Sequence, residues 1–256
     1  MMQGKKGFVF GVLNDYSLGW HIANQLHQHG CELAFSHMPG EKFERRVTKA
    51  TEQFKPRFLI PCDVSKDEDI AAAFRMAGEQ FGTFDVLVHS VAFAPADTFA
   101  NPFLETSREG WRTALEVSAY SLVALARAAL PFMNTGGSIA TLTYYASEKY
   151  FPNYNMMAVA KAALECSVRY LAAELGRHPK HVRVNAVSAG AIKTLASSGT
   201  GDINKMIDHY QEKAPLPWDD APTHVGKAAL YLLSDLSSGV TGEIHYVDAG
   251  YNIVGW

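Results

Sequence analysis

The sequence predicts one α/β domain over residues 1–256, built as a Rossmann-type, doubly wound sheet with helices on both faces. A chain of 256 residues has the length that a single doubly wound sheet commonly reaches. Apolar residues make up 48% and charged residues 19%, which is enough apolar surface for a large core. Short strand-like runs also alternate with longer helical patterns from end to end, as in a parallel sheet with crossover helices.

Seven short runs of Val, Ile, Leu and Phe are the strand candidates, so we expect about seven parallel strands. They show no strict alternation with polar residues, and both faces of each strand are therefore expected to be buried. The predicted strands are Phe8–Val12, Glu32–Ser36, Phe58–Pro61, Val86–Ser90, Ser138–Thr143, Val182–Ser188 and Glu243–Val247.

Longer stretches between these runs have the 3.6-residue periodicity of helices. The predicted helices are Trp20–His29, Asp67–Phe81, Trp111–Phe132, Asn155–Gly176 and Thr223–Ser234. The charged run Glu41–Arg46 is interpreted as the solvated face of a further helix. Each crossover helix is expected to connect two parallel strands with right-handed topology and to cover one face of the sheet.

Charge and residue types exclude several classes of function. Lys and Arg number 23 against 26 Asp and Glu, a net charge of −3 without a basic stripe, so no nucleic-acid partner is expected. We find no secretory signal and no run of 18 apolar residues, and expect a cytoplasmic protein with no membrane segment. Cys31, Cys62 and Cys166 are widely spaced in apolar surroundings and are predicted to be buried, reduced thiols. The ten histidines lack the spacing of metal ligands, so no metal is expected.

The loop after the first strand is the first candidate for a ligand site, because ligands bind at the carboxyl ends of parallel strands. Gly11 permits a tight turn there, and Ser17 and Leu18 stand where the next helix begins. Free N–H groups at a helix start bind phosphate, so this loop can hold a pyrophosphate. The loop lacks the G-x-G-x-x-G spacing, however, and ordinary turn chemistry explains the same residues.

Two further strand-end loops favour a dinucleotide site. Asp63 follows the third strand, where its carboxylate can accept the adenine amino group while Val64 packs on the ring. The alternative is that Asp63 only caps the turn at Ser65. Ser90 and Val91 follow the fourth strand, where a backbone of small residues can pass close to the adenine ribose.

A tyrosine-rich segment before the longest helix offers two Tyr–Lys pairs. Tyr145 and Lys149 have the i, i+4 spacing used by short-chain reductases, but they lie in a polar loop upstream of Pro152. Tyr154 and Lys161 are seven residues apart, which is roughly 700° of helical rotation and only about 20° from the starting direction. We therefore expect Tyr154 and Lys161 to share one helix face and to form the functional pair.

An ordered set of motifs runs from Gly4 to Gly250. Its segments are Gly11–Ala23, Glu32–Phe35, Cys62–Val64, His89–Pro95, Pro152–Asn155 with Lys161, and Ala189–Ala196. In these segments and in the Tyr-x6-Lys spacing, the sequence resembles the bacterial enoyl-acyl-carrier-protein reductases of the short-chain dehydrogenase/reductase superfamily. Two positions depart from the family pattern, namely Met38, where a polar residue is common in NADH-using members, and Ala191, where a proline is usual.

The resemblance implies an enzyme for the last step of the fatty-acid elongation cycle. In that step NADH gives hydride to the β carbon of a trans-2-enoyl thioester carried by acyl carrier protein. The resemblance assigns catalytic roles to Tyr154, which stabilises charge on the thioester oxygen, and to Lys161, which holds the nicotinamide ribose. Tyr144 matches a second family tyrosine beside the acyl chain. Relatives of this kind are homotetramers, so a homotetramer is expected.

Two sets of contacts are predicted from the strand-end loops and the resemblance. The predicted cofactor contacts are Gly11, Ser17, Leu18, Met38, Asp63, Val64, Ser90, Val91, Lys161, Ile192 and Thr194. The predicted substrate contacts are Ala94, Tyr144, Tyr154, Leu195 and Met206. Leu195 and Met206 belong to a substrate-binding lid that we expect around residues 194–217.

NADH is expected as the cofactor rather than NADPH. The turn Ser36–Gly40 carries no acidic residue for the ribose hydroxyls, but it also carries no basic residue for a 2′-phosphate before Lys42. Two alternatives remain. One is another short-chain carbonyl or 3-oxoacyl reductase that uses Tyr145 and Lys149, and the other is a non-catalytic NAD(P)-binding redox regulator.

Overall fold

The computed structural model describes residues 1–194 and 203–255, and within them the strands form one parallel sheet. The strand order is β3-β2-β1-β4-β5-β6-β7, and each neighbouring pair is parallel. The strands are β1 (Lys6–Phe10), β2 (Glu32–His37), β3 (Leu59–Pro61), β4 (Phe84–His89), β5 (Met133–Thr143), β6 (Arg183–Ala189) and β7 (Ile244–Val247). The predicted fold class is confirmed, and each predicted strand is present with shifted ends, β5 beginning five residues early.

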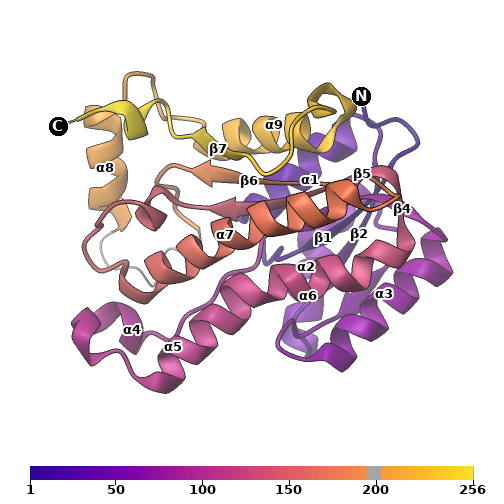
Figure 1. Ribbon diagram of the computed structural model, residues 1–256, viewed down its shortest axis with the longest axis horizontal. Coiled ribbons are helices and arrows are strands. Elements are labelled where there is room, and N and C mark those ends of the chain that lie inside the picture. Colours follow the sequence, from indigo (N-terminus) through magenta and orange to yellow (C-terminus); the bar gives the residue numbers. More distant parts are fainter. Residues whose placement is uncertain (195–202, 256) are drawn as a thin grey trace.

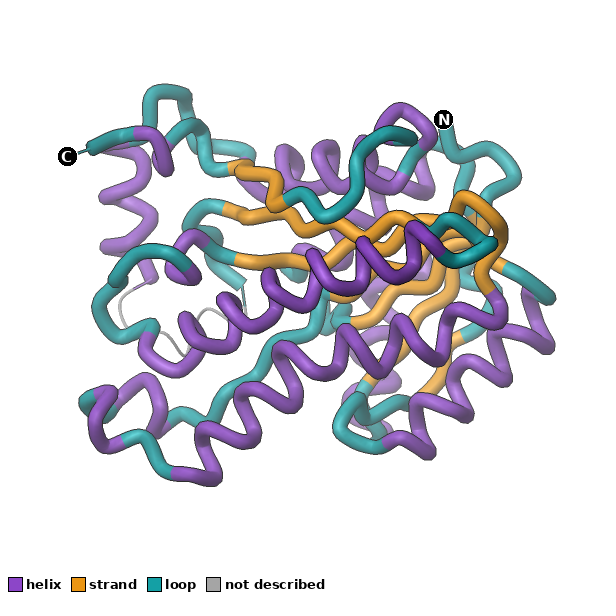
Figure 2. Tube along the Cα trace, viewed as in Figure 1, coloured by secondary structure: helices purple, strands orange, loops and turns teal. Residues whose placement is uncertain are grey.

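Helices cover both faces of this sheet (Figures 1 and 2). They are α1 (Leu18–Gln28), α2 (Glu41–Thr51), α3 (Asp67–Phe81), α4 (Asp97–Ala100), α5 (Arg108–Leu115), α6 (Ser121–Ala129), α7 (Asn155–Arg177), α8 (Ile203–Lys213) and α9 (Ala221–Leu233). Short 3-10 turns occur at Glu52–Phe54, Phe103–Glu105, Leu130–Phe132, Tyr145–Ser147, Asp235–Ser237 and Tyr251–Ile253. The solvated helix face predicted at Glu41–Arg46 is the first half of α2.

Each face of the sheet has its own apolar core. Phe8 and Phe10 of β1 point to the side covered by α3, α6 and α7, while Val9 between them points to the side covered by α1, α2 and α9. On β4, Leu87 faces the first core and Val88 the second. Successive side chains of a strand point to opposite faces of the sheet, and both faces are apolar here. The strands therefore show no alternation with polar residues.

The helix predicted over Trp111–Phe132 is present but is not uniform. It begins at Arg108 as α5, passes through a π-helical turn at Glu116–Tyr120, and continues as α6. Inside that turn the fully buried Ser118 hydroxyl accepts from the backbone N–H of Phe93 (2.9 Å) and donates to the Phe93 carbonyl (2.8 Å). The π turn therefore fastens the helix to the loop after β4.

By length and composition alone, the continuous helix Arg108–Phe132 could cross a membrane, which the sequence analysis did not expect. In the structure 44% of its apolar window is buried, and its α6 part packs on the core that it shares with α3 and α7. A core helix of an α/β fold has this composition because one side of it faces the sheet.

The carboxyl ends of the strands meet at one edge of the sheet. In Figure 1 the arrowheads of β6 and β7 point toward α8, and the C-terminus lies at the same end of the molecule. The strand order reverses between β1 and β4, whose carboxyl ends are the switch point where doubly wound sheets bind ligands. The predicted site residues that follow β1 to β6 are therefore brought to one side of the molecule.

Candidate active site

The loops after β1 and β4 touch at the switch point. Gly11 has a φ of +96°, and a Cβ at this position would overlap the carbonyl of Ser90. A Cβ on Gly19, at the start of α1, would lie 3.1 Å from the Ser90 Cβ. Only glycine at position 11 allows both the left-handed backbone and this close approach. The structure thus gives a steric reason for the predicted role of Gly11.

The start of α1 offers unpaired N–H groups. The Ser17 hydroxyl accepts from the backbone N–H of Leu13 (3.0 Å) and Asn14 (3.2 Å) and donates to the Asn14 side-chain oxygen (3.2 Å), so it holds the loop together. Among the described residues, none accepts from the N–H groups of Leu18 and Gly19. These two donors and the positive end of the helix dipole suit an anion.

The predicted adenosine contacts lie at the ends of the neighbouring strands. One carboxylate oxygen of Asp63 accepts from both the N–H (3.0 Å) and the hydroxyl (2.7 Å) of Ser65, which is the turn-capping arrangement that the sequence left open. Val64 is buried, and Val91 is half-buried against the same core. Met38 follows β2 and is 41% exposed, so its side chain can still cover a ligand.

Tyr154 lies just before α7 rather than in it. The helix begins at Asn155, and both Asn153 and Asn155 have positive φ angles, so the predicted helical rotation from Tyr154 to Lys161 applies only approximately. The Tyr154 ring packs on the Tyr144 ring at a centroid distance of 4.9 Å. Burial, and then Tyr144, raises the pKa of Tyr154 far above that of a free phenol. The hydroxyl therefore stays protonated and acts as a donor.

Lys161 is buried on α7, and its Nζ donates to the carbonyl of Leu142 at 2.9 Å. Glu165, one helical turn further, is also buried and accepts from the hydroxyl of Thr143 at 2.6 Å. Consecutive residues at the end of β5 thus hold the lysine and the carboxylate side by side. Burial lowers the pKa of Lys161 to about 8, and the negative charge of Glu165 opposes that change.

A buried histidine lies beneath this site. His89 bonds through Nδ1 to the Thr141 hydroxyl (2.7 Å) and through Nε2 to the Ser121 hydroxyl (2.8 Å). Because Ser121 already donates to the Val117 carbonyl (2.6 Å), Nε2 carries the ring proton and Nδ1 accepts from Thr141. Burial, and then Lys161, lowers the pKa of His89 to about 3, so the ring is neutral and links β4, β5 and α6.

The alternative pair of Tyr145 and Lys149 lies elsewhere. Tyr145 belongs to a short 3-10 turn, and its hydroxyl donates to the carbonyl of Asn252 at 3.3 Å. Lys149 lies in the irregular chain that follows this turn. The two residues therefore share no face of a long helix, as the sequence analysis expected.

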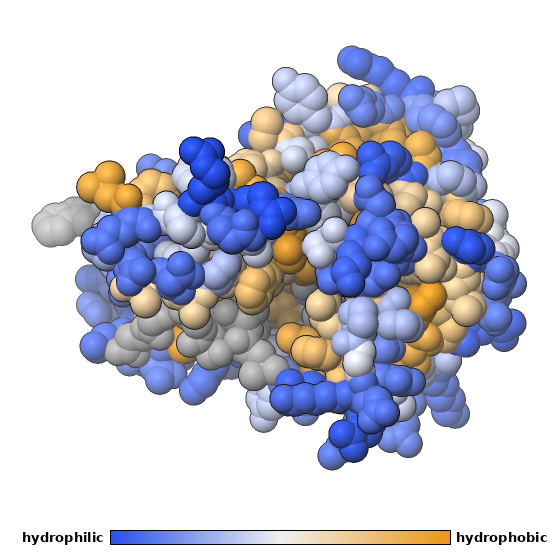
Figure 3. Space-filling model, turned by 90° about the horizontal axis from the view of Figure 1, so that it is seen from below, coloured by the Kyte–Doolittle hydropathy of each residue, from blue (hydrophilic) through white to orange (hydrophobic). Residues whose placement is uncertain are grey.

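Apolar side chains surround the two central tyrosines. Tyr154 contacts two core clusters, one that includes Ala94 and one that includes Tyr144 and Ile192. Met206 on α8 is half-buried against the second cluster, and Thr194 is half-buried after β6. Leu195 lies outside the described residues. Seen from below, apolar residues line a recess in the middle of this face, with hydrophilic residues around it (Figure 3).

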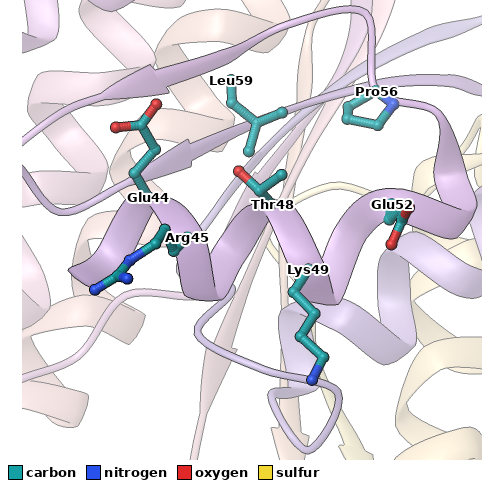
Figure 4. A pocket seen from close by; sticks show the side chains of 7 residues that line it. All are labelled: Glu44, Arg45, Thr48, Lys49, Glu52, Pro56 and Leu59. Carbon is teal, nitrogen blue, oxygen red and sulfur yellow. The ribbon is translucent and has the colours of Figure 1, made fainter. Parts of the chain in front are cut away.

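A separate surface depression lies between α2 and β3 (Figure 4). Its lining residues are Glu44, Arg45, Thr48, Lys49, Glu52, Pro56 and Leu59. Both acidic and basic side chains line it, and none of the predicted site residues belongs to it. It is the outer surface of a charged helix and not part of the site.

Comparison with known proteins settles the family. The sequence profile described as Enoyl-(Acyl carrier protein) reductase matches residues 11–252. An enoyl-[acyl-carrier-protein] reductase [NADH] from Synechocystis sp. is 49% identical over 256 residues, which cover 99% of this chain and 98% of that protein. The chain belongs to the enoyl-acyl-carrier-protein reductase family.

Two solved reductase structures match over the whole chain. The Bacillus cereus enoyl-acyl carrier protein reductase with NADP+ and an indole naphthyridinone has 44% identity and a TM-score of 0.95, and the match covers 100% of this chain and 99% of that one. The Anaplasma phagocytophilum reductase in complex with NAD has 41% identity and a TM-score of 0.93, with 100% and 94% coverage. The predicted family, enzyme class and fold are confirmed.

Sequence reasoning missed three residues near the site of this reductase. Glu165 had a signal, because it is an acidic residue four positions after Lys161 on an otherwise apolar helix face. Trp218 is buried and donates from Nε1 to the carbonyl of Ala191 at 2.9 Å, so the loop at Ala191 is held without the usual proline. Tyr210 on α8 is fully buried beside the site, and nothing in its local pattern distinguishes it from a core residue.

Proposed function

We propose that this enzyme reduces the trans-2 double bond of an enoyl thioester carried by acyl carrier protein, with NADH as its cofactor. The observation that carries the proposal is that the Tyr144 and Tyr154 rings pack together just before α7, the helix on which buried Lys161 bonds to the carboxyl end of β5. Relatives named as NADH-dependent enoyl reductases, which share close to half of their residues with this chain, support the same reaction and the same cofactor.

The residues at the switch point fit a dinucleotide. The N–H groups of Leu18 and Gly19 have no acceptor among the described residues and lie at the start of α1 beside the turn at Gly11, which suits the pyrophosphate. Met38, Asp63, Val64, Ser90 and Val91 would surround the adenosine half, and Lys161, Ile192 and Thr194 the nicotinamide half. Because the Ser17 hydroxyl is used within its own loop, it supports the phosphate site by holding the loop. When bound, the reduced cofactor supplies the hydride to the β carbon.

Tyr154 is assigned the electrophilic role. Hydride addition at the β carbon leaves an enolate, whose negative charge lies on the thioester oxygen until the α carbon takes up a proton. A phenol that stays protonated in a buried pocket stabilises that oxygen by donating a hydrogen bond, and such a bond is strongest where water is excluded. The tyrosine hydroxyl need not ionise at any step.

Lys161 is assigned a positioning role toward the nicotinamide ribose. Its ammonium has three donors, and the Leu142 carbonyl takes one of them. The remaining two can bind the ribose hydroxyls and fix the ring over the substrate. The Leu142 contact matters because it fixes the direction in which the other two protons point.

The acyl chain is proposed to lie between Ala94 on one side and Met206 of α8 on the other. Tyr144 belongs to the same apolar cluster as Met206, and its ring lies 5.0 Å from that of Phe151. Leu195 and the lid expected around residues 194–217 remain predictions, because residues 195–202 lie outside the described part of the chain.

We propose a homotetramer in the cytoplasm. Trp111 and Tyr120 on the α5–π–α6 helix and Tyr170 on α7 are large side chains that are 42%, 47% and 70% exposed, which suits burial against other copies of the chain. Cys31 and Cys62 are buried as predicted, but Cys166 is exposed, so the prediction of a buried thiol is wrong for Cys166. Burial raises the pKa of Cys31 and Cys62 to about 12, so these two thiols stay protonated. Light scattering is expected to give four times the chain mass.

The deciding experiment follows the absorbance of NADH with crotonyl-coenzyme A and, separately, with acetoacetyl-coenzyme A. Steady oxidation with the crotonyl thioester alone supports the enoyl reductase. Oxidation with the acetoacetyl thioester instead would support a 3-oxoacyl reductase. Binding of NADH without turnover of either thioester would support the redox regulator.

A further inference from the structure

A third phenol lies beside the two tyrosines of the active site. Tyr210 of α8 is 0% exposed and Tyr144 is 7% exposed, yet neither hydroxyl has a hydrogen-bond partner among the described residues. Leaving a buried hydroxyl unpaired costs free energy, and most such groups in native proteins are paired. Two unpaired phenols that are near neighbours therefore need an explanation beyond packing.

The Tyr210 ring is held firmly in place. It stacks on Tyr251 at a centroid distance of 3.8 Å and an interplanar angle of 15°. Tyr251 belongs to a C-terminal turn fixed by buried Asp248, whose carboxylate accepts from the N–H groups of Gly250 (3.0 Å) and Asn252 (2.9 Å). These contacts fix the position of the Tyr210 ring but provide no hydrogen-bond partner for its hydroxyl.

The two phenols influence each other unequally. Burial raises the pKa of both, but Tyr210 then lowers the pKa of Tyr144, whereas Tyr144 raises the pKa of Tyr210. That asymmetry is the one expected when Tyr210 donates and the Tyr144 oxygen accepts. The contact stops short of hydrogen-bond geometry in this structure. Tyr251 and Asp248 also raise the pKa of both phenols, so each stays protonated.

We propose that Tyr210 donates a hydrogen bond to the Tyr144 hydroxyl when substrate is bound, so that the Tyr144 hydroxyl in turn donates a hydrogen bond to the thioester oxygen beside Tyr154. Tyr210 is thus a positioning residue that acts through Tyr144, and this inference rests on the enoyl reductase function proposed above. The Tyr144 ring lies 4.9 Å from that of Tyr154, which brings the donor chain to the reacting group.

The chain of donors has a physical advantage. A hydroxyl that accepts a hydrogen bond becomes a better donor, because each bond polarises the next. Negative charge on the thioester oxygen would therefore be stabilised most when both phenols are present. The effect belongs to the transition state, so it should change kcat and leave KM for the enoyl thioester unchanged.

The test is a double-mutant cycle of Tyr210→Phe and Tyr144→Phe, measured with NADH and crotonyl-coenzyme A. Phenylalanine keeps the stack on Tyr251 and removes only the hydroxyl. We expect Tyr210→Phe to lower kcat on the order of fivefold at constant KM. In the Tyr144→Phe background, the same change should have no further effect. The thermal midpoint should not fall, because the hydroxyl removed has no partner.

Tyr145→Phe is the matched control. It removes a hydroxyl that contacts the same C-terminal turn, through Asn252, but lies outside the phenol chain, and its kcat is expected to equal that of the unaltered enzyme. An unchanged kcat in Tyr210→Phe, or full additivity with Tyr144→Phe, would overturn the inference while leaving the enoyl reductase function intact. If the unaltered enzyme itself fails to oxidise NADH with the crotonyl thioester, the proposed function fails first, and this inference fails with it.

Discussion

In the half of the sheet formed by β1 to β4 the candidate site offers mainly main-chain donors to a pyrophosphate, whereas in the half formed by β5 to β7 it offers side chains that are buried or half-buried. The first half contributes the turn at Gly11 and the N–H groups at the start of α1. The second contributes Tyr144, Tyr154 and Lys161, each supported by neighbours that are themselves buried.

This difference matches what each half has to bind. A pyrophosphate presents several oxygens of one charge, and a row of backbone donors serves them without any particular side chain. A thioester gains charge at one oxygen during the reaction, so it needs a donor at one place. Substitutions should therefore act through backbone shape in the first half and through single functional groups in the second.

The largest effect is expected in the second half, for Lys161→Ala. Removal of the ammonium takes away the ribose contact, so kcat/KM should fall about a hundredfold or more and NADH should bind more weakly. Lys149→Ala is the matched control, because Lys149 lies in the nearby irregular chain and should leave both quantities nearly unchanged. Steady-state kinetics and NADH fluorescence titration measure the two effects. The opposite pattern would restore the Tyr145–Lys149 alternative.

Tyr154→Phe should have the next largest effect and a different signature. The lost hydrogen bond is strongest when charge is on the thioester oxygen, so kcat should fall roughly a hundredfold while KM changes little. NADH binding should stay as it is, in contrast to Lys161→Ala. If kcat is unaffected, the electrophilic role passes to Tyr144.

In the first half, Gly11→Ala tests the role of backbone shape. The added Cβ meets the Ser90 carbonyl, and alanine is strained at a φ of +96°, which costs about 1–3 kcal/mol. We expect a lower thermal midpoint and about tenfold weaker NADH binding, with kcat at saturating NADH little changed. Gly136→Ala is a suitable control, since Gly136 also has a positive φ but has open space around it. Equal NADH affinity in Gly11→Ala and Gly136→Ala would contradict the steric argument.

The two halves also differ in how well the sequence predicted them. Each predicted strand is a short apolar run that turn residues follow. The end of the run marks the end of the strand, so the strand-end positions of Gly11, Asp63 and Ser90 followed from the sequence pattern alone. The Tyr154–Lys161 pair followed from spacing, although Tyr154 lies one residue before α7 and reaches the site through an irregular turn. Local patterns carry this information because it depends on neighbours in the chain.

Contacts between distant segments could not be predicted in this way. Tyr210 meets Tyr144 and Tyr251 only after α8 and the C-terminal turn fold over the carboxyl edge of the sheet. Likewise, the bond from Trp218 to the Ala191 carbonyl joins segments 27 residues apart. An isolated tyrosine or tryptophan in an amphipathic stretch has the same pattern as an ordinary core residue.

The smallest expected effect concerns pH and the charge of Glu165. The pKa of buried Lys161 is about 8, so the lysine is protonated below that pH and activity should decline above it. Glu165→Gln removes the charge that raises this pKa, and the alkaline decline should therefore move to lower pH.

Thr143→Val is the control, because it removes the hydrogen bond to Glu165 but keeps the carboxylate charge, and its pH profile should not move. The same lowered pKa of Lys161 also makes the stability of the unaltered protein depend on pH. Between about pH 8 and the ordinary lysine value of 10.5, the unfolded chain binds the proton that folded Lys161 has lost, so the free energy of unfolding contributed by this group rises with pH. A pH profile that shifts equally in Glu165→Gln and Thr143→Val would show that the hydrogen bond, and not the charge, supports Lys161. The pyrophosphate contacts of the β1 to β4 half should show no such pH dependence, since backbone donors do not titrate.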